Sequence, residues 1–209
     1  MADPAGTIRL VELICARLCH DLGGLIGTVD NALEMVTGDA GRDNEVLAFA
    51  SSASKSLARR LRLMRAALGP ETETLSLTAL RALTVPPMAA RRISIDTTAL
   101  APERHFSPEA GRVTLNLILL AADSLPKGGI ITLMGDPSDL FLRIEGPGAA
   151  WPPGLTACLQ DEASAMAALT HAQGVQMPLT VLLALSRRLR ISPVFGPGPG
   201  VIGLRLTGA

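Results

Sequence analysis

His20 and Asp21 are adjacent in the segment Leu13–Val36, which is rich in apolar and small residues. A carboxylate beside a histidine can accept the proton of one ring nitrogen, which orients the imidazole and leaves the other nitrogen nucleophilic. Asp beside His is also common by chance. The pair therefore indicates a nucleophilic histidine only if neighbouring residues point the same way.

Three glycines, Gly23, Gly24 and Gly27, follow His20 on or near the same side of a helix. Each costs about 1 kcal/mol relative to alanine inside a helix, and no turn accounts for them. One interpretation is that they clear the surface beside the imidazole, so that a partner can reach it. The other is that they form a small-residue groove for close helix packing.

Two heptad series indicate the helices that carry these residues. Apolar positions alternate in steps of three and four, which is typical of a bundle seam. A break at Thr37–Asp43, with Asp43 as N-cap, separates the helices, and Gly69 and Pro70 end the second. We expect residues 8–68 to form an antiparallel helical hairpin, with His20 at an exposed position. The predicted seam comprises Val11, Cys15, Leu18, Leu22, Leu25, Val29, Ala32, Val36, Leu47, Ala50, Ser54, Leu57, Leu61, Met64 and Leu68.

Two helices alone cannot bury both seams. The simplest solution is a homodimer that forms a four-helix bundle. The alternative is that the hairpin packs on the C-terminal part of its own chain.

Cys15, Cys19 and His20 do not indicate a metal site, because Cys15 lies on the seam and no fourth ligand is close in the sequence.

Residues 70–209 change to mixed α/β patterning, so we expect one domain over 1–69 and a second over 70–209. The second is predicted to be an α/β sandwich, giving an α+β fold overall. His105 and His171 are expected at the surface or in loops, and Trp151 in a loop. The predicted strands are 93–98, 130–134, 140–145, 191–195 and 201–206, the last two flanking a Gly-Pro loop at 196–200. The predicted helices are Ser107–Leu125, Leu155–Ala172 and Pro178–Leu189.

Composition excludes several classes of protein. The chain has 209 residues, 48% of them hydrophobic, which is enough for a sizeable core. A net charge of zero and 2% aromatic residues argue against nucleic-acid binding. No apolar run is long enough to span a membrane, and no signal peptide is visible. Three cysteines that form no disulfide framework favour reduced thiols and a cytoplasmic location.

The segment Leu13–Val36 resembles the histidine-containing helix of the alphaproteobacterial histidine phosphotransferases of the ChpT family. The likeness rests on Ala16-Arg17-Leu18-Cys19-His20-Asp21 and on Asn31-Ala32-Leu33-Glu34-Met35. Two positions differ from related boxes. Leu25 replaces the usual proline, so the expected helix kink is weaker or absent. Gly24 stands where kinases of this type carry a Thr or Asn associated with phosphatase action.

The second domain resembles the ATP-binding domain of histidine kinases without its nucleotide motifs. After Asn116, the second asparagine that helps to hold Mg²⁺ is replaced by Leu120. The aspartate that reads adenine falls on Ile144. The glycine turn that would cradle phosphates is missing from Gly174–Leu179. We therefore expect no ATP binding and no bound cofactor or metal.

The resemblance implies a histidine phosphotransfer protein rather than an ATP-dependent kinase. His20 would relay a phosphoryl group between receiver-domain aspartates of a hybrid histidine kinase and of response regulators, with Asp21 orienting the ring. Mg²⁺ would come with the receiver. Receiver docking would involve Arg17, Gly24, Asn31 and Glu34, with Arg17 either attracting the phosphate or simply solvated. The alternative is a non-catalytic dimeric scaffold or inhibitor that docks receivers or kinases without using His20.

Overall fold

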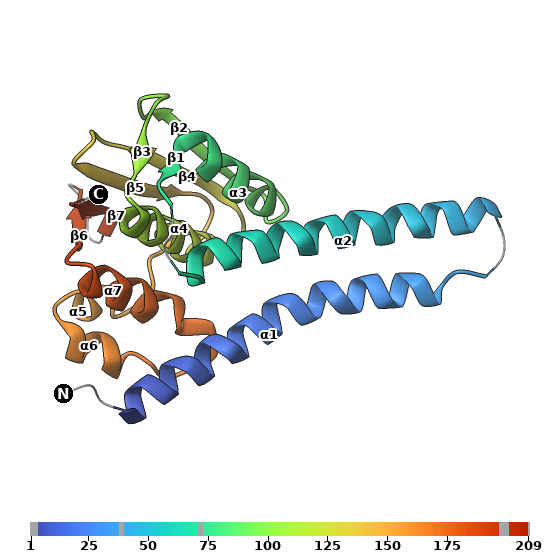
Figure 1. The fold of residues 1–209 in the computed structure, drawn as a ribbon, viewed down its shortest axis with the longest axis horizontal. Coiled ribbons are helices and arrows are strands. Elements are labelled where there is room, and N and C mark those ends of the chain that lie inside the picture. Colours follow the sequence, from blue (N-terminus) through green and yellow to red (C-terminus); the bar gives the residue numbers. More distant parts are fainter. Residues whose placement is uncertain (1–3, 38–39, 71–72, 197–200, 209) are drawn as a thin grey trace.

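The computed structural model describes residues 4–37, 40–70, 73–196 and 201–208. A long helical hairpin projects from an α/β domain, and the outer halves of both helices extend beyond the sheet (Figure 1). The elements are α1 (Pro4–Glu34), α2 (Ala40–Leu68), β1 (Leu75–Ser76), α3 (Leu77–Ala89), β2 (Ile93–Ala99), β3 (His105–Phe106), α4 (Pro108–Asp123), β4 (Gly129–Met134), β5 (Asp139–Glu145), α5 (Leu155–Cys158), α6 (Glu162–Ala167), the 3₁₀ turn η1 (Ala172–Gly174), α7 (Gln176–Ser186), β6 (Arg190–Phe195) and β7 (Val201–Thr207).

The predicted helical hairpin is present as α1 and α2. Helix α1 continues through Leu25 without interruption. The prediction that Asp43 is the N-cap of the second helix is wrong, because α2 begins at Ala40 and Asp43 lies in its first turn. Asp43 Oδ1 instead accepts the backbone N–H of Thr37 at 2.9 Å. This hydrogen bond joins the segment after α1 to the first turn of α2. A negative charge is favourable at the N-terminus of a helix.

The five predicted strands all form, each one residue longer than expected, and make one sheet in the order β2-β4-β5-β7-β6. Strands β2 and β4 are parallel and the other neighbours are antiparallel. The turn into β4 needs glycine, because Gly128 has φ +83° and a Cβ there would lie 2.5 Å from the Arg92 carbonyl oxygen. The small β1–β3 ladder was not predicted.

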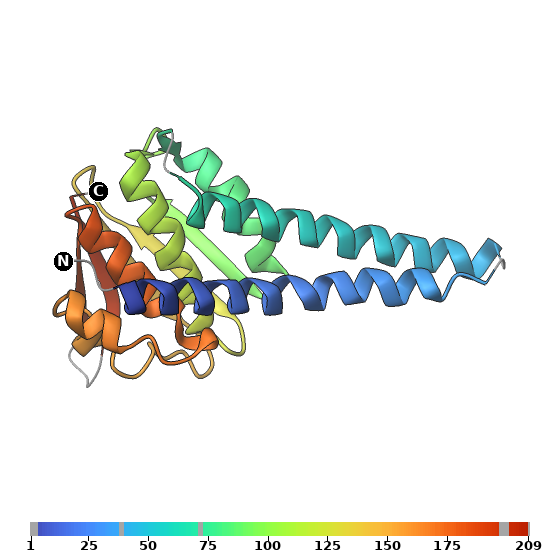
Figure 2. The same ribbon diagram turned by 60° about the horizontal axis from the view of Figure 1, so that its bottom comes forward.

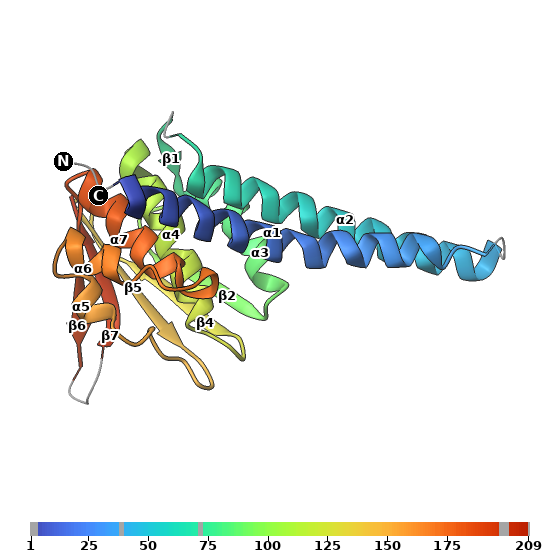
Figure 3. The same cartoon turned by 90° about the horizontal axis from the view of Figure 1, so that it is seen from below.

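Helices α3, α4 and α7 cover one face of the sheet, so the predicted α/β sandwich and the α+β fold class are correct. Figure 3 shows α4 and α7 between the hairpin and the sheet. Helix α4 begins at the N-cap Ser107, whose hydroxyl accepts the N–H of Ala110 at 3.2 Å. Alternate strand residues face the helices and are at most 1% exposed: Ile131, Leu133, Leu140, Leu142, Leu204 and Leu206.

The base of the hairpin shares its core with the second domain. Leu63, Met64 and Ala67 of α2 belong to the same buried cluster as α3, α4 and the sheet. The end of α2 is also bonded across the predicted boundary at 69/70. Asn116 Nδ2 donates to the Ala67 carbonyl at 2.8 Å, and Arg112 Nη2 donates to that of Leu68 at 3.0 Å. These bonds satisfy carbonyls that a helix end leaves unpaired.

Two parts of the second domain differ from the prediction. The single helix expected over Leu155–Ala172 is wrong, because the segment forms α5, α6 and η1. Asp161 restarts the chain as the N-cap of α6, with Oδ1 accepting the N–H of Ser164 at 2.7 Å. Helix α3 was not predicted, and it contains Pro86 and Pro87 in its second half. The predicted Gly-Pro loop lies mostly outside the described residues.

The predicted seam is covered only in part. Several of its members pack between α1 and α2 or against the second domain, including Leu18, Ala32, Ala50 and Met64. Six others are exposed: Val11, Cys15, Val36, Leu47, Ser54 and Leu61. The chain by itself therefore leaves part of the heptad pattern uncovered.

Candidate functional site

His20 lies on α1 where the hairpin leaves the second domain, and its side chain is 73% exposed. Steps of four and three from His20 lead along one face of α1 to Gly24, Gly27, Asn31 and Glu34. Residues at these spacings lie on the same side of a helix. We call these five residues the His20 face. All are exposed except Gly27, which is half-buried.

The glycines near His20 have no packing role within this chain. A Cβ built at Gly23, Gly24 or Gly27 meets no atom within 4 Å. The interpretation that they allow close helix packing therefore fails inside one protomer. The surface beside the imidazole is open, as it needs to be if another molecule approaches. In Figure 2, the C-terminal part of α1 extends outward, past the helices of the second domain.

Asp21 presents one carboxylate oxygen to His20 and the other to two arginines. Its Oδ1 is 3.4 Å from His20 Nδ1, a long contact that orients the ring weakly. Its Oδ2 accepts from Arg17 Nε at 3.0 Å and from Arg60 Nη2 at 2.7 Å. Burial raises the pKa of Asp21, but the hydrogen bonds and charges of Arg17 and Arg60 outweigh it and hold the pKa below its ordinary value. Asp21 is therefore a carboxylate at neutral pH.

The same contacts continue into the second domain. Arg17 Nη2 lies 3.0 and 2.9 Å from the two carboxylate oxygens of Asp123, at the end of α4. Arg91 Nη1 lies 3.3 Å from Asp123 Oδ1, and its Nη2 donates to the Ala122 carbonyl. We call Arg60, Asp21, Arg17 and Asp123 the ionic ladder; Arg91 is a further neighbour of Asp123 outside it. Alternating charges thus run from α2 past His20 to α4.

The position of Arg17 corrects the interpretation that its side chain is simply solvated. Its side chain is only 15% exposed, so it is not solvated. Each of its guanidinium nitrogens already has an acceptor, since Nη1 donates to the Gln173 carbonyl at 2.9 Å. Burial lowers the pKa of Arg17, but Asp123 and Asp21 outweigh it and raise the pKa above its ordinary value. Arg17 is thus a permanent cation held by the two carboxylates of the ladder, and its attraction for a phosphate stays a prediction.

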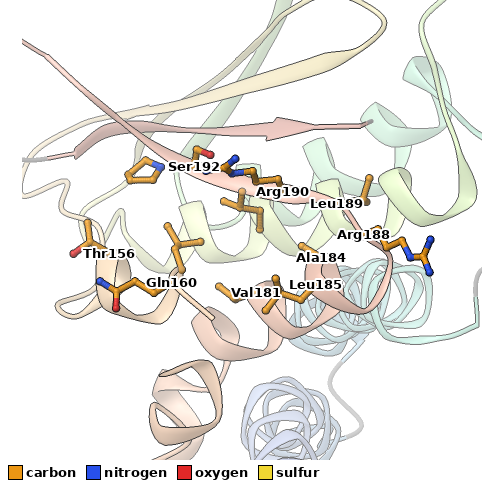
Figure 4. A pocket seen from close by; sticks show the side chains of 12 residues that line it. Thr156, Gln160, Val181, Ala184, Leu185, Arg188, Leu189, Arg190 and Ser192 are labelled. Atoms are coloured by element: carbon orange, nitrogen blue, oxygen red, sulfur yellow. The ribbon is translucent and has the colours of Figure 1, made fainter. Parts of the chain in front are cut away.

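Two pockets border the ladder. One of about 250 Å³ lies between the hairpin and α3, and Asp21, Leu25 and Arg60 are among its lining residues. Another of about 700 Å³, which includes Asp123, Trp151 and Gln173, corresponds to the place of the degenerate nucleotide motifs. A third, of about 520 Å³, lies between α5, α7 and β6 and holds none of the predicted site residues (Figure 4).

The remnants of the kinase motifs are part of the core. Asn116 is fully buried, and its Oδ1 accepts from Gln176 Nε2 at 3.0 Å. Leu120 is 2% exposed and Ile144 9%. Within the described ranges no cluster of three potential metal ligands occurs. Burial raises the pKa of the Cys158 thiol to about 11. The exposed polar and thiol side chains outside the site include Cys15, Cys19, His105 and His171, and the two histidines are exposed as expected.

No helix in the described part of the chain combines the length and the apolar character needed to cross a bilayer.

Residues 78–194 match the model of the histidine phosphotransferase C-terminal domain, which is more than half of the chain, and the protein belongs to this family. It is similar to the protein phosphotransferase ChpT of Brucella abortus (strain 2308), with 24% identity over 199 residues, 88% of this chain and 90% of that protein. The solved structure of a bacterial phosphotransferase superposes with a TM-score of 0.71 at 20% identity, covering 99% of this chain and 97% of that one.

Sequence reasoning found His20 and Asp21 but missed Arg60 and Asp123. The four-residue spacing of Arg17 and Asp21 on a helix was a usable signal for an ion pair. The other contacts join residues that are distant in the sequence, by 39 positions for Asp21 and Arg60 and by 106 for Arg17 and Asp123. No local pattern indicates them.

Proposed function

We propose that this protein is a histidine phosphotransfer protein of a two-component phosphorelay, which passes a phosphoryl group between receiver-domain aspartates through His20. The observation that carries the proposal is the open His20 face. Three glycines lie beside an exposed imidazole, and none has a packing role in this chain. Helix interiors disfavour glycine, so a partner that needs this space explains the cluster.

The chemistry requires little from this chain. With the Nδ1 proton donated toward Asp21 Oδ1, the lone pair of Nε2 attacks the phosphorus of an aspartyl phosphate. The P–N bond forms as the P–O bond breaks, and the donor carboxylate leaves. Asp21 balances the positive charge that develops on the ring. An acceptor carboxylate then attacks the phosphorus and the P–N bond breaks. Mg²⁺ and the other charges that stabilise the phosphoryl group would be supplied by the receiver.

Receiver docking is assigned to the His20 face. Gly24 and Gly27 leave room beside the imidazole, while Asn31 and Glu34 supply polar contacts further along α1. The second domain abuts the same end of α1, since Leu13 packs with Leu169 and Val175. A receiver seated over His20 would therefore meet both domains.

The proposed active form is a homodimer built through an exposed stripe that runs along the hairpin, from its outer end toward the second domain. Exposed residues on α2 repeat in steps of four and three, with leucines at both ends and small side chains between them. Exposed apolar residues on α1 repeat in steps of seven and three. Such a pattern is typical of one half of a four-helix bundle. We call these residues the outer stripe, which consists of Leu47, Ser51, Ser54, Ala58 and Leu61 on α2 with Cys19, Ile26, Leu33 and Val36 of the first helix and its end.

We further propose that the protein has no ATP-dependent kinase activity and binds no cofactor. Asn116 supports this, because its side chain is fully buried and is hydrogen-bonded to Ala67 and Gln176 within the core. The three free thiols favour a cytoplasmic location, where receivers of a phosphorelay would meet the protein.

The test is phosphotransfer from a ³²P-labelled, phosphorylated receiver domain to the wild type and to His20→Ala. We expect acid-labile label on the wild type and none on the variant. The matched control is His105→Ala, another exposed histidine outside the site, which should accept label normally. Binding of the receiver to each variant is measured in parallel by calorimetry.

Two results would contradict the proposal. If His20→Ala accepts label as the wild type does, another residue carries the phosphoryl group. If the receiver binds the wild type but donates no label, the protein acts as a scaffold that docks receivers without using His20.

A further inference from the structure

Arg17 is shared between two carboxylates that belong to different domains. Its Nε donates to Asp21 on α1, and its Nη2 lies between the two oxygens of Asp123 on α4. The guanidinium fork of arginine can also bind one carboxylate with both ends. Which carboxylate receives each end of Arg17 therefore decides how many oxygens of Asp21 remain free.

In the structure, Arg17 and Arg60 both occupy Oδ2 of Asp21, and Oδ1 is left facing His20 Nδ1. Asp123 keeps the Nη2 end of Arg17 away from Asp21. Without Asp123, the fork of Arg17 would have Asp21 as its one remaining carboxylate. The favourable bidentate geometry would then take Oδ1 as well, and His20 would lose its acceptor.

We propose that Asp123, in the second domain, is a positioning residue for phosphotransfer: by holding Nη2 of Arg17, it leaves Oδ1 of Asp21 free to favour the Nδ1–H tautomer of His20. The inference rests on the proposed function, because it concerns the reactivity of His20. Asp123 touches neither the imidazole nor the receiver's phosphoryl group, and it acts through Arg17 and Asp21.

The two domains are held together by more than this ion pair. Leu63, Met64 and Ala67 are buried in the core of the second domain, and Asn116 binds the end of α2. Asp123→Asn therefore keeps the fold and the domain arrangement while it removes the charge that retains Arg17. Arg91→Gln is the matched control, because it removes the other arginine on Asp123 and leaves the Arg17–Asp123 contact intact.

The experiment measures single-turnover transfer from a phosphorylated receiver to the wild type, Asp123→Asn, Asp123→Glu and Arg91→Gln. General acid–base groups contribute about 10²–10⁴-fold, and Arg60 still holds Asp21. We therefore expect Asp123→Asn to lower the rate constant at saturating receiver about tenfold, with the half-saturating receiver concentration unchanged. Asp123→Glu should recover most of the rate, and Arg91→Gln should match the wild type.

A second measurement does not depend on transfer. Long-range ¹H–¹⁵N NMR of the imidazoles, with His20 assigned by comparison with His20→Ala, reports the ring tautomer in the unphosphorylated protein. We expect the Nδ1–H form in the wild type and a shift toward the Nε2–H form in Asp123→Asn alone.

An unchanged tautomer in Asp123→Asn overturns the inference, as does a change in half-saturation at constant rate, since both indicate a purely structural role. If the wild type accepts no label, the proposed function fails, and the NMR comparison still decides whether Asp123 positions His20.

Discussion

The two halves of the helical hairpin differ in how far their apolar side chains are buried. At the base, Leu63 is fully buried, and Arg17 and Arg60 are tied into the ionic ladder. In the outer half, apolar residues such as Ile26 and Leu47 are 54% and 47% exposed. The base contributes side chains to the buried core of its own chain, although Ile8 and Val11 stay exposed there, whereas the outer half leaves apolar side chains exposed on both helices. The histidine of the candidate site lies where the two halves meet, so it combines fixed support with open access.

The largest effect should come from the base. Leu63→Ala removes a fully buried side chain, and we expect it to lower the free energy of unfolding by about 2–5 kcal/mol. Leu61→Ala, two residues earlier on the outer stripe, should cost about 1 kcal/mol, and that loss should grow with protein concentration, as for a residue of a dimer interface. Urea unfolding followed by circular dichroism at two concentrations gives both values. Equal losses would remove the distinction between the shared core and the outer stripe.

The next effect concerns the outer stripe. Leu47→Asp places a charge on the stripe of both protomers, and we expect the dimer dissociation constant to rise about 100-fold, or about 2.7 kcal/mol. Ala48→Asp is the matched control, since Ala48 is also exposed but lies about 100° around the helix from Leu47 and outside the stripe. Sedimentation velocity across a concentration series measures both variants. A monomeric wild type, or an equal effect of both substitutions, would contradict the proposed interface.

A smaller effect tests the ladder at the junction. At neutral pH Asp21→Asn should lower stability by about 1.5 kcal/mol, because hydrogen bonds to charged groups are lost. The folded pKa of Asp21 lies below the ordinary 3.8 of the unfolded chain, so its stabilisation is present above pH 3.8 and is lost as the pH falls through the folded pKa. Unfolding curves of wild type and variant should therefore converge below that pH. A constant difference down to the lowest pH would show that the charge of Asp21 is not the cause.

The smallest effect on folding is expected at the His20 face. Gly24→Ala adds a methyl group that meets no atom of this chain, so stability should rise by up to about 1 kcal/mol. The same methyl group should weaken receiver binding several-fold, which calorimetry measures. Gly23→Ala should stabilise equally and affect binding less, because it lies to the side of the face. If Gly24→Ala changes neither quantity, the glycines do not serve a docking partner.

The hairpin, the five strands and the exposed His20 could be predicted from the sequence, because heptad spacing and strand alternation are local signals. Helix α3 could not, because the pair Pro86-Pro87 argues against a helix that tertiary packing nevertheless stabilises. Helical spacing over 155–172 merges α5, α6 and η1 into one helix unless Asp161 is recognised as an N-cap.

The candidate site divides in the same way. His20 and Asp21 are adjacent, and other members of the His20 face follow at helical spacing, so the sequence alone places them on one helix. The sequence does not show which part of the predicted seam is exposed. The same heptad pattern includes residues that pack within this chain and residues that stay exposed. Arg60 and Asp123 reach Asp21 and Arg17 only after the chain has folded, and side-chain charge alone does not indicate which ions will meet.

Each protomer has one His20 and one open face around it, and this has a kinetic consequence. Under the proposed function, the donor and the acceptor receiver bind the same His20 face in turn, so the donor has to leave before the acceptor can bind. Phosphotransfer through one shared binding site follows ping-pong kinetics, with the phosphorylated protein as the intermediate between the two binding events. An unphosphorylated acceptor in excess would occupy the His20 face before the donor binds. Throughput would then pass through a maximum and fall as the acceptor accumulates, so the relay limits its own output without a separate inhibitor.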